Sequence, residues 1–241
     1  MGTQLSAGGS RWGPAAGRAA RRLSASTAAG ALLGLLVGGV GGRLAMGLLA
    51  AMNPTATGVI SDDGFRIGQF TPSGTANLLV ATTLIGALGG GIYLVLRQVA
   101  FGPRWFRALS LSLGPAIVVG SMVVHVDGVD FILLRPPLFA VAVFVAIPGI
   151  YAALLTVLAE RWLAPDGPFA RGRRVLTLAP LLLWIPLAPV LAVLVAGWLL
   201  GEWALPARAR AAALWVARAG LVGLFSASLY ALVRDTVRLL E

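Results

Sequence analysis

The sequence predicts an all-α protein, a polytopic transmembrane helical bundle of about six spans, N-in and C-in. Of its 241 residues, 58% are hydrophobic and only 12% are charged, whereas a soluble domain carries about 25% charged residues. Six apolar runs are long enough to cross a bilayer, which takes about 20 mainly apolar residues in a helix. Arginines gather in alternate connections between these runs, as expected for a membrane protein with a fixed orientation.

The six predicted spans divide the chain into a membrane domain, 26–235, between two cytoplasmic tails. The basic tail 1–25 is expected to be disordered, and 236–241 forms the second tail. The spans cover residues 26–52, 75–96, 108–124, 137–158, 175–199 and 211–233. The fifth run contains Pro180, Pro186 and Pro189. Because each proline removes a backbone donor, this run is expected to be kinked or locally unwound.

The arginines set the predicted orientation. Thirteen fall on one side of the six spans: Arg11, Arg18, Arg21, Arg22, Arg97, Arg104, Arg107, Arg161, Arg171, Arg173, Arg174, Arg234 and Arg238. Four fall on the other, Arg66, Arg135, Arg208 and Arg210. Positive residues favour the cytoplasmic side, so both termini are expected there. The predicted location is the bacterial cytoplasmic membrane, which the protein crosses several times.

The outer side carries most of the acids. These are Asp62, Asp63, Asp127, Asp130 and Glu202, five of the nine in the chain. The outer loops 53–74 and 125–137 are expected to form a partly ordered cap over the outer ends of spans one, four and six. In the first loop, Phe65, Ile67 and Phe70 alternate with polar residues. This alternation favours a short strand or a segment packed on one side.

Residues 40–160 resemble a known group of proteins. The layout is "GRLAM…NP…G…SDDGFRIGQFT..GT.NLL", followed by "VDFILLRPPLFAVAVFVAIPGIYAALLTVLAER". It is similar to a group of uncharacterised multi-span membrane proteins of actinobacteria. The matching positions are Arg43, Asp62, Asp63, Gly64, Gly68, Thr71, Asp130, Phe131, Leu133, Leu134 and Pro136. The resemblance implies a multi-span fold in a bacterial membrane, and it supplies no activity.

Two arginines fall inside predicted spans. Arg43 lies about nine residues, or about 13 Å, from the outer end of span one. A charge at a helix centre costs roughly 2.5–3.5 kcal/mol on insertion scales, and snorkelling lowers that cost. Arg218 in span six is expected to reach the same outer face. Three interpretations stay open: an ion pair with an outer-loop acid, a pocket for an anion or lipid headgroup, and a charge coupled to transport.

The hypothesised binding site is therefore a polar cluster on the outer face. Its members are Arg43, Asp62, Asp63, Arg66, His125, Asp127, Asp130 and Arg218. The "HVDGVD" stretch at 125–130 has hard ligands for a divalent ion. Its spacing matches no known metal motif, and aspartates around Gly128 also suit a turn. No metal and no cofactor is expected.

Small residues recur every four positions on two predicted spans. They are Gly30, Gly34, Gly38 and Gly42 on span one, and Ala219, Gly223, Ala227 and Ala231 on span six, with Gly86 and Gly90 on span two. Such stripes let two helix backbones approach closely. The contact can lie within one chain or between two copies.

Composition narrows the function classes. The chain has no Cys and one His, which excludes disulfides, thiolate sites and multi-histidine metal sites. Its net charge of +10 comes from arginines between apolar runs, so nucleic acid is not an expected partner. The first hypothesis is a non-enzymatic protein that packs with lipid, a second copy or another membrane protein through its cap. The alternatives are a small transporter or channel component, and a membrane enzyme using the outer acids.

Overall fold

The protein is all-helical. The computed structural model describes residues 12–61, 64, 66–126, 128–172, 177–193, 195–196 and 206–241, and this part of the chain contains no strand. In chain order the helices are α1 (Trp12–Leu33), η1 (Gly34–Gly41), α2 (Gly42–Met52), η2 (Pro54–Ala56), α3 (Pro72–Val99), α4 (Arg104–Val123), α5 (Val129–Leu133), α6 (Pro137–Leu163), α7 (Pro168–Arg171), η3 (Ala179–Trp184) and α10 (Ala207–Arg238). The segment η1 is π-helical and continues α1 into α2 without a break.

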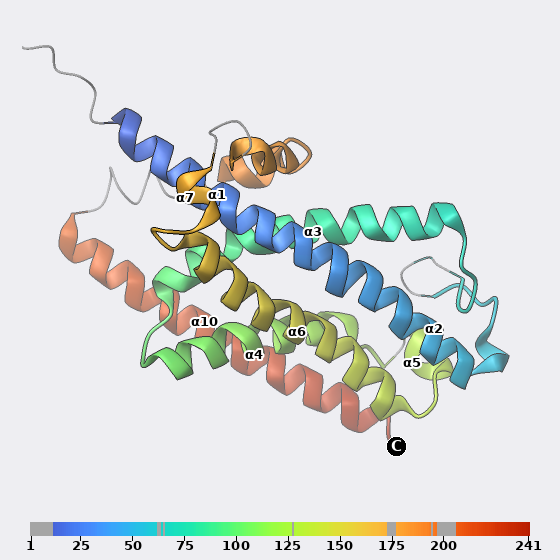
Figure 1. Cartoon of the computed structure of the whole chain (residues 1–241). Coiled ribbons are helices and arrows are strands. Elements are labelled where there is room, and N and C mark those ends of the chain that lie inside the picture. Colours follow the sequence, from blue (N-terminus) through green and yellow to red (C-terminus); the bar gives the residue numbers. More distant parts are fainter. Residues whose placement is uncertain are drawn as a thin grey trace, which may run out of the picture.

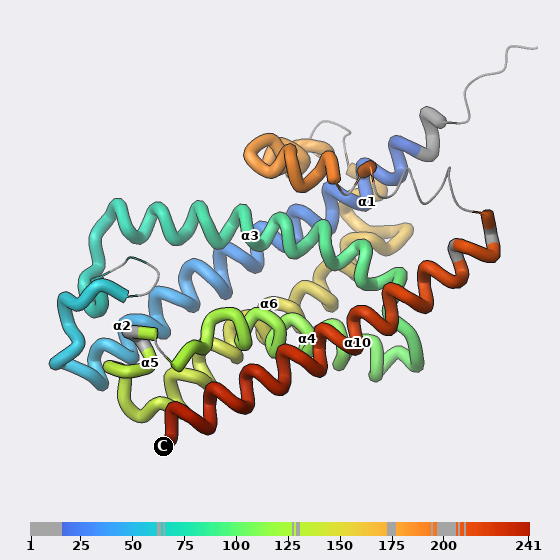
Figure 2. Tube along the Cα trace, turned by 180° about the vertical axis from the view of Figure 1, so that it is seen from behind, coloured from blue at the N-terminus to red at the C-terminus, as the bar shows by residue number. Residues whose placement is uncertain are grey.

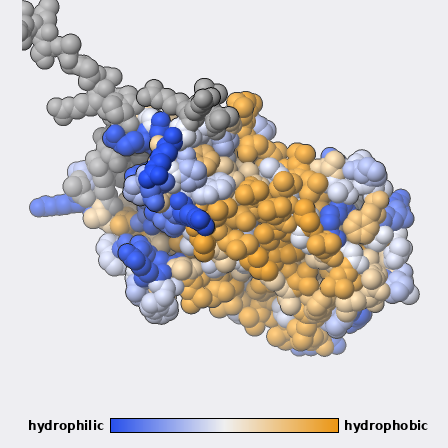
Figure 3. Space-filling model, in the orientation of Figure 1, coloured by the Kyte–Doolittle hydropathy of each residue, from blue (hydrophilic) through white to orange (hydrophobic). Residues whose placement is uncertain are grey.

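Five helical stretches in the described chain are long and apolar enough to cross a membrane. They are Ala16–Met52, Pro72–Val99, Arg104–Val123, Pro137–Arg171 and Ala211–Arg238. Each overlaps one of the runs predicted from the sequence. Hydrophobic residues cover the middle of the visible face, and hydrophilic side chains gather towards its ends (Figure 3). The all-helical class predicted from composition is thus confirmed.

The long helices lie side by side in the order α3, α1, α6, α4, α10 (Figures 1 and 2). The bundle has two ends. The first end holds the start of α1, the connections 100–103 and 164–167, and the start of α10. The second end holds the connections 53–71 and 124–136 and the end of α10.

The closest helix contact is that between α1 and α3, and it depends on glycine. A Cβ placed on Gly30 would overlap the carbonyl oxygen of Gly86, and one on Gly90 would overlap that of Ser26. A Cβ on Gly34 would come within 2.8 Å of the Cα of Gly86. The backbones therefore approach too closely for any larger residue at these positions. The stripe on span one makes its contact within the chain.

The other positions of the small-residue pattern are less crowded by neighbouring helices. Gly38 lies near the side chain of Thr82, whereas a Cβ on Gly42 would meet nothing within 4 Å. On α10 the same holds for Gly223, and the neighbouring Ala219 and Ala227 are exposed. The stripe on α10 thus faces away from the other described helices.

The predicted fifth span is replaced by shorter pieces. Over its described residues, the run 175–199 forms η3 and a helical turn from 188 to 193. The prolines at 180, 186 and 189 explain the break, because each lacks an amide donor and its ring blocks a continuous helix. Pro180 lies in the first turn of η3, where the missing donor costs nothing.

The indole of Trp184 fixes η3 to the side of the bundle. Its Nε1 donates to Oγ1 of Thr27 at 2.9 Å, and both side chains are buried. A Cβ on Gly91 would lie 2.5 Å from the ring, so α3 accepts the indole only because residue 91 is glycine. This segment therefore packs on α1 and α3 and does not run from one end to the other.

The start of α1 and the end of α10 lie at opposite ends of the bundle (Figure 1). The described chain has five candidate spans where the sequence predicted six, and the location of both tails on one side of a membrane stays a prediction. Arg208 and Arg210, expected on the outer side, instead lie at the start of α10, at the first end.

Candidate functional site

A small hairpin forms the outer part of the second end. Gly58 N donates to Ile67 O and Ile67 N donates to Val59 O, each at 2.9 Å. A single antiparallel bridge joins Ile60 to Arg66. Gly58 has a φ of 88°, a left-handed conformation that glycine adopts without strain. The alternation of apolar residues thus corresponds to a tight hairpin and not to a named strand.

One buried amide joins the two connections of the second end. Asn53 is 6% exposed. Its Nδ2 donates to Leu49 O at 2.9 Å and to Arg135 O at 3.1 Å, and its Oδ1 accepts from Arg135 N at 2.7 Å. The side chain thereby satisfies both backbone groups of a residue 82 positions away. In the structure the cap is the pair of connections 53–71 and 124–136, in place of the predicted bounds 53–74 and 125–137.

An apolar cluster lies beneath the cap. Its buried members come from α2, η2, the second connection and α6: Leu49, Ala56, Val124, Phe131, Leu134, Ala140 and Val141. Ile67 of the hairpin packs against the cluster from outside, and Leu232 and Leu239 pack against it from α10. The cap therefore rests on the end of α2, the start of α6 and the end of α10, whereas the sequence predicted it over the opposite end of the last span.

Two arginines line one small cavity under the hairpin. Arg43 comes from the first turn of α2 and is 9% exposed, and its guanidinium lies 5.8 Å from the centre of the Phe70 ring. Arg66 comes from the hairpin, where Nη1 donates to Gly58 O at 3.1 Å. The cavity has a volume of about 30 Å³, room for about two water molecules.

The lining of the cavity is partly polar and mostly apolar. Ser61 and Gln69 line it together with the two arginines. The remaining lining comes from Met46, Leu49, Ile67, Gly68, Phe70, Leu134 and Phe144. Apolar walls strengthen electrostatic interactions inside a cavity because they exclude water. The arrangement suits a group of a few atoms that carries negative charge.

The other predicted site residues of this end are only partly placed. His125 is exposed, and its Nδ1 lies 3.0 Å from Val123 O. Asp62, Asp63 and Asp127 lie outside the described residues, and only the backbone of Asp130 is described, in α5. The ion pair between Arg43 and an outer-loop acid therefore stays a prediction. In the part of the chain that is described, no three His, Asp or Glu residues gather as a metal site.

Arg218 does not belong to this site. It lies at the first end, where its Nε donates to Val99 O at 3.0 Å. Its guanidinium lies 5.6 Å from the centre of the Phe101 ring and 5.0 Å from that of Trp215. The expectation that Arg43 and Arg218 reach the same face is wrong, because α10 starts at the first end and runs toward the second, opposite to the predicted direction.

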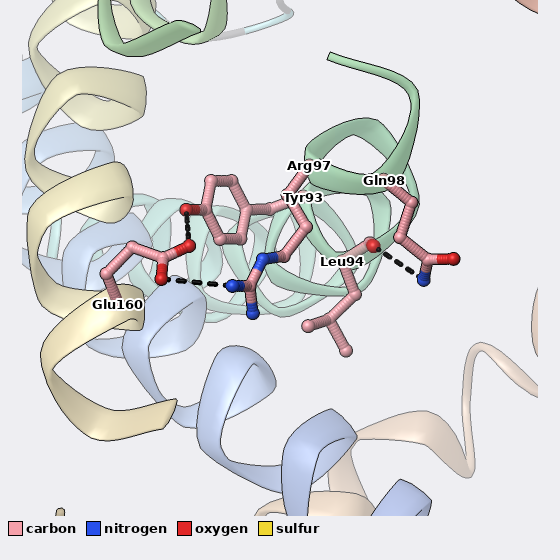
Figure 4. A network of polar contacts seen from close by, with 5 residues as sticks. All are labelled: Tyr93, Leu94, Arg97, Gln98 and Glu160. Carbon is pink, nitrogen blue, oxygen red and sulfur yellow. Dashed lines mark hydrogen bonds and ion pairs between the residues drawn. The ribbon is translucent and has the colours of Figure 1, made fainter. Parts of the chain in front are cut away.

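Sequence reasoning missed a polar network at the first end. The Tyr93 hydroxyl donates to Glu160 Oε1 at 2.7 Å, and Arg97 Nη2 lies 3.0 Å from Glu160 Oε2 (Figure 4). The network joins α3 to α6. The opposite charges at the ends of two predicted spans, Arg97 and Glu160, were a signal that could have found it.

Buried hydroxyl groups on α1 were also missed. Ser24 donates to Thr177 O and Ser26 to Gly90 O, and both serines are fully buried. From α6, the Tyr151 hydroxyl donates to Gly86 O at 2.8 Å. These hydrogen bonds join a side chain to the backbone of a residue far away in the sequence, so no local sequence pattern predicts them.

No protein-family model, curated protein or solved structure matches the chain. The resemblance to the actinobacterial group therefore stays a prediction.

Proposed function

We propose that the chain is a multi-pass integral protein of the bacterial cytoplasmic membrane, with five spans and its first end in the cytoplasm. The arginine distribution supports this orientation. Eleven described arginines lie toward the first end: Arg18, Arg21, Arg22, Arg97, Arg104, Arg107, Arg161, Arg171, Arg208, Arg210 and Arg218. Five lie toward the second: Arg43, Arg66, Arg135, Arg234 and Arg238. Cytoplasmic ends of membrane proteins carry the positive excess.

The proposed role is binding and not catalysis, with the cap as the recognition surface for an anionic group. The observation that carries this proposal is the shared cavity of Arg43 and Arg66. A guanidinium near the end of a span is costly to bury and marks a functional site by default. Two of them on one cavity favour a carboxylate or a phosphate, which accept paired N–H donors. The cavity volume suits the anionic group itself and not a whole headgroup.

Inorganic phosphate tests the proposal. A ligand that binds only the folded protein raises its melting temperature in proportion to ln(1 + [L]/Kd). Phosphate, added at constant ionic strength, is expected to raise the melting temperature of the purified protein more than chloride does. Arg66→Gln is the variant of choice, because Arg66 is exposed and its loss spares the core.

Arg238→Gln is the matched control, since it removes one exposed arginine from the same end without touching the cavity. General salting effects of phosphate act on all variants alike. The extra stabilisation should vanish in Arg66→Gln and persist in Arg238→Gln. Equal phosphate stabilisation of both variants contradicts the proposed site.

Transport is the second candidate function, and one observation favours it. The π-helical segment η1 occupies eight residues in the middle of the first candidate span. Segments of π-helix are rare and occur mostly at functional sites, and interrupted helices form the binding sites of many transporters. Anion flux into liposomes that contain the purified protein distinguishes transport from binding alone.

A further inference from the structure

Five side chains at the first end form a continuous row of ring contacts. Arg218 lies over the rings of Trp215 and Phe101. Phe101 in turn contacts Phe106, with ring centres 5.7 Å apart, and Phe106 meets Trp105 edge to face at 5.8 Å. The row connects α10, the connection 100–103 and the first turn of α4. It thus crosses the surface where these three elements meet.

The guanidinium of Arg218 is held in a fixed orientation. Its Nε donates to the carbonyl of Val99, the last residue of α3, and helix-terminal carbonyls lack partners within their own helix. Two aromatic rings restrict the guanidinium further. Within the described chain its hydrogen bonding is confined to Nε. The Nη1 and Nη2 groups therefore remain as a planar pair of donors, the geometry that binds phosphate oxygens in pairs.

The aromatic side chains around this guanidinium are exposed at the surface. Trp215 is 67% exposed, Trp105 68% and Phe101 47%. Further along α10, toward the second end, Val222 and Leu224 are exposed and the surface is mainly apolar. From the first end toward the second, the aromatic side chains and the cationic group thus come first and an apolar surface follows. A phospholipid has the same two regions, a charged headgroup and apolar acyl chains.

We infer that the first end binds an anionic phospholipid, with its phosphate on the Nη1 and Nη2 groups of Arg218 and its acyl chains along α10 and α4. Charge favours an anionic lipid over a zwitterionic one, because Arg104, Arg107 and Arg208 are also exposed at this end. Basic residues near the membrane surface attract anionic lipid. The rings of Trp215 and Trp105 lie where aromatic side chains meet lipid headgroups. This site is separate from the cap at the second end.

Lipid binding to the purified full chain tests the inference. Bound lipids are counted by native mass spectrometry after titration with phosphatidylglycerol or phosphatidylcholine. The first phosphatidylglycerol is expected to bind more tightly than the first phosphatidylcholine. Arg218→Gln should weaken the binding of that first phosphatidylglycerol about tenfold, since it removes one pair of charge-assisted hydrogen bonds.

Arg208→Gln is the matched control: it makes the same charge change on the same helix, but Arg208 takes no part in the ring contacts. Arg208→Gln should change the affinity for the first phosphatidylglycerol by no more than about twofold, because an exposed surface charge contributes a weaker attraction. Trp215→Ala removes an exposed ring without disturbing the core, and it should also weaken the first site. It replaces Arg218→Gln as the test variant if Arg218→Gln does not fold. Equal affinity for the two lipids, or equal loss in Arg208→Gln and Arg218→Gln, overturns the inference.

Discussion

The close contact of α1 and α3 can be tested by adding one methyl group, in Gly86→Ala. The new Cβ would overlap the carbonyl oxygen of Gly30 and lie 2.7 Å from the Cα of Gly34. Both atoms belong to the backbone, so no side-chain rotation relieves the overlap. Nonbonded carbon atoms prefer a separation of about 3.5–4.0 Å. The two helices must therefore move apart by about 1 Å.

The expected cost follows from overpacking, which typically destabilises a core by about 1–3 kcal/mol per inserted group. Alanine also has a higher helix propensity than glycine by up to about 1 kcal/mol, which opposes the loss. Gly223→Ala is the control for helix propensity, because it adds the same methyl group to α10 where nothing lies within 4 Å. The difference between the two variants should thus be about 1–3 kcal/mol. For a chain of this length that corresponds to a gap of about 2–12 °C in melting temperature.

Both variants are heated in detergent, and the fraction that remains monodisperse is measured by size-exclusion chromatography. Gly86→Ala should melt below wild type and below Gly223→Ala. If the two variants melt within one degree of each other, the glycine contact does not determine the stability of the α1–α3 pair, and the argument from close approach is wrong.

Two further side chains give stability predictions. Asn53→Ala leaves the N–H and C=O of Arg135 without their buried partner, so it should lower the free energy of unfolding by about 2–4 kcal/mol. Asn77→Ala, at an exposed position, is the control and should change it by less than about 0.5 kcal/mol. Both free energies are measured by chemical unfolding in detergent. Trp184→Phe and Thr27→Val each break the same hydrogen bond. In a double-mutant cycle, the double variant should therefore be more stable than the sum of the two single losses predicts, by about 1 kcal/mol. Strict additivity would show that the bond contributes nothing.

Hydropathy predicted the long helices because the length of an apolar run determines whether a helix can cross a bilayer. The run 75–96 corresponds to α3 at Pro72–Val99, and 137–158 to α6 at Pro137–Leu163. The run 175–199 has the required hydropathy but three prolines, and hydropathy ignores backbone donors. The described part of this run packs on the side of the bundle, so α10 runs opposite to the predicted direction. This is why Arg218 was assigned to the wrong end.

The candidate site was predictable where its residues are close in the sequence. Arg43 lies in span one and Arg66 in the predicted loop that follows it, so their shared cavity follows from the position of that loop at the end of span one. Asn53 was not predictable as a structural residue, because its partner is the backbone of Arg135. Backbone groups carry no sequence signal. The Tyr93–Glu160 bond joins two side chains on helices far apart in the chain, and the opposite charges of Arg97 and Glu160 were the signal for it.

Single cysteines determine which ends share a side, because the chain has no native Cys. The structure places Thr55 and Glu241 at the second end and Asp166 at the first, all of them exposed. In intact cells, a membrane-impermeant thiol reagent should therefore modify Thr55→Cys and Glu241→Cys and spare Asp166→Cys. Six crossings would give a different result, with Glu241→Cys protected together with Asp166→Cys.

The Glu241→Cys result decides between the two arrangements because both agree on the other positions. Labelling after the cells are opened is the control, since all three cysteines should then react equally. Modification of Asp166→Cys alone in intact cells would keep five crossings and invert the bundle. That outcome would remove the support that arginine bias gives to the proposed orientation, because the arginine-rich end would then face outward. The cavity of Arg43 and Arg66 would in that case open to the cytoplasm, and its anionic ligand would have to be sought there.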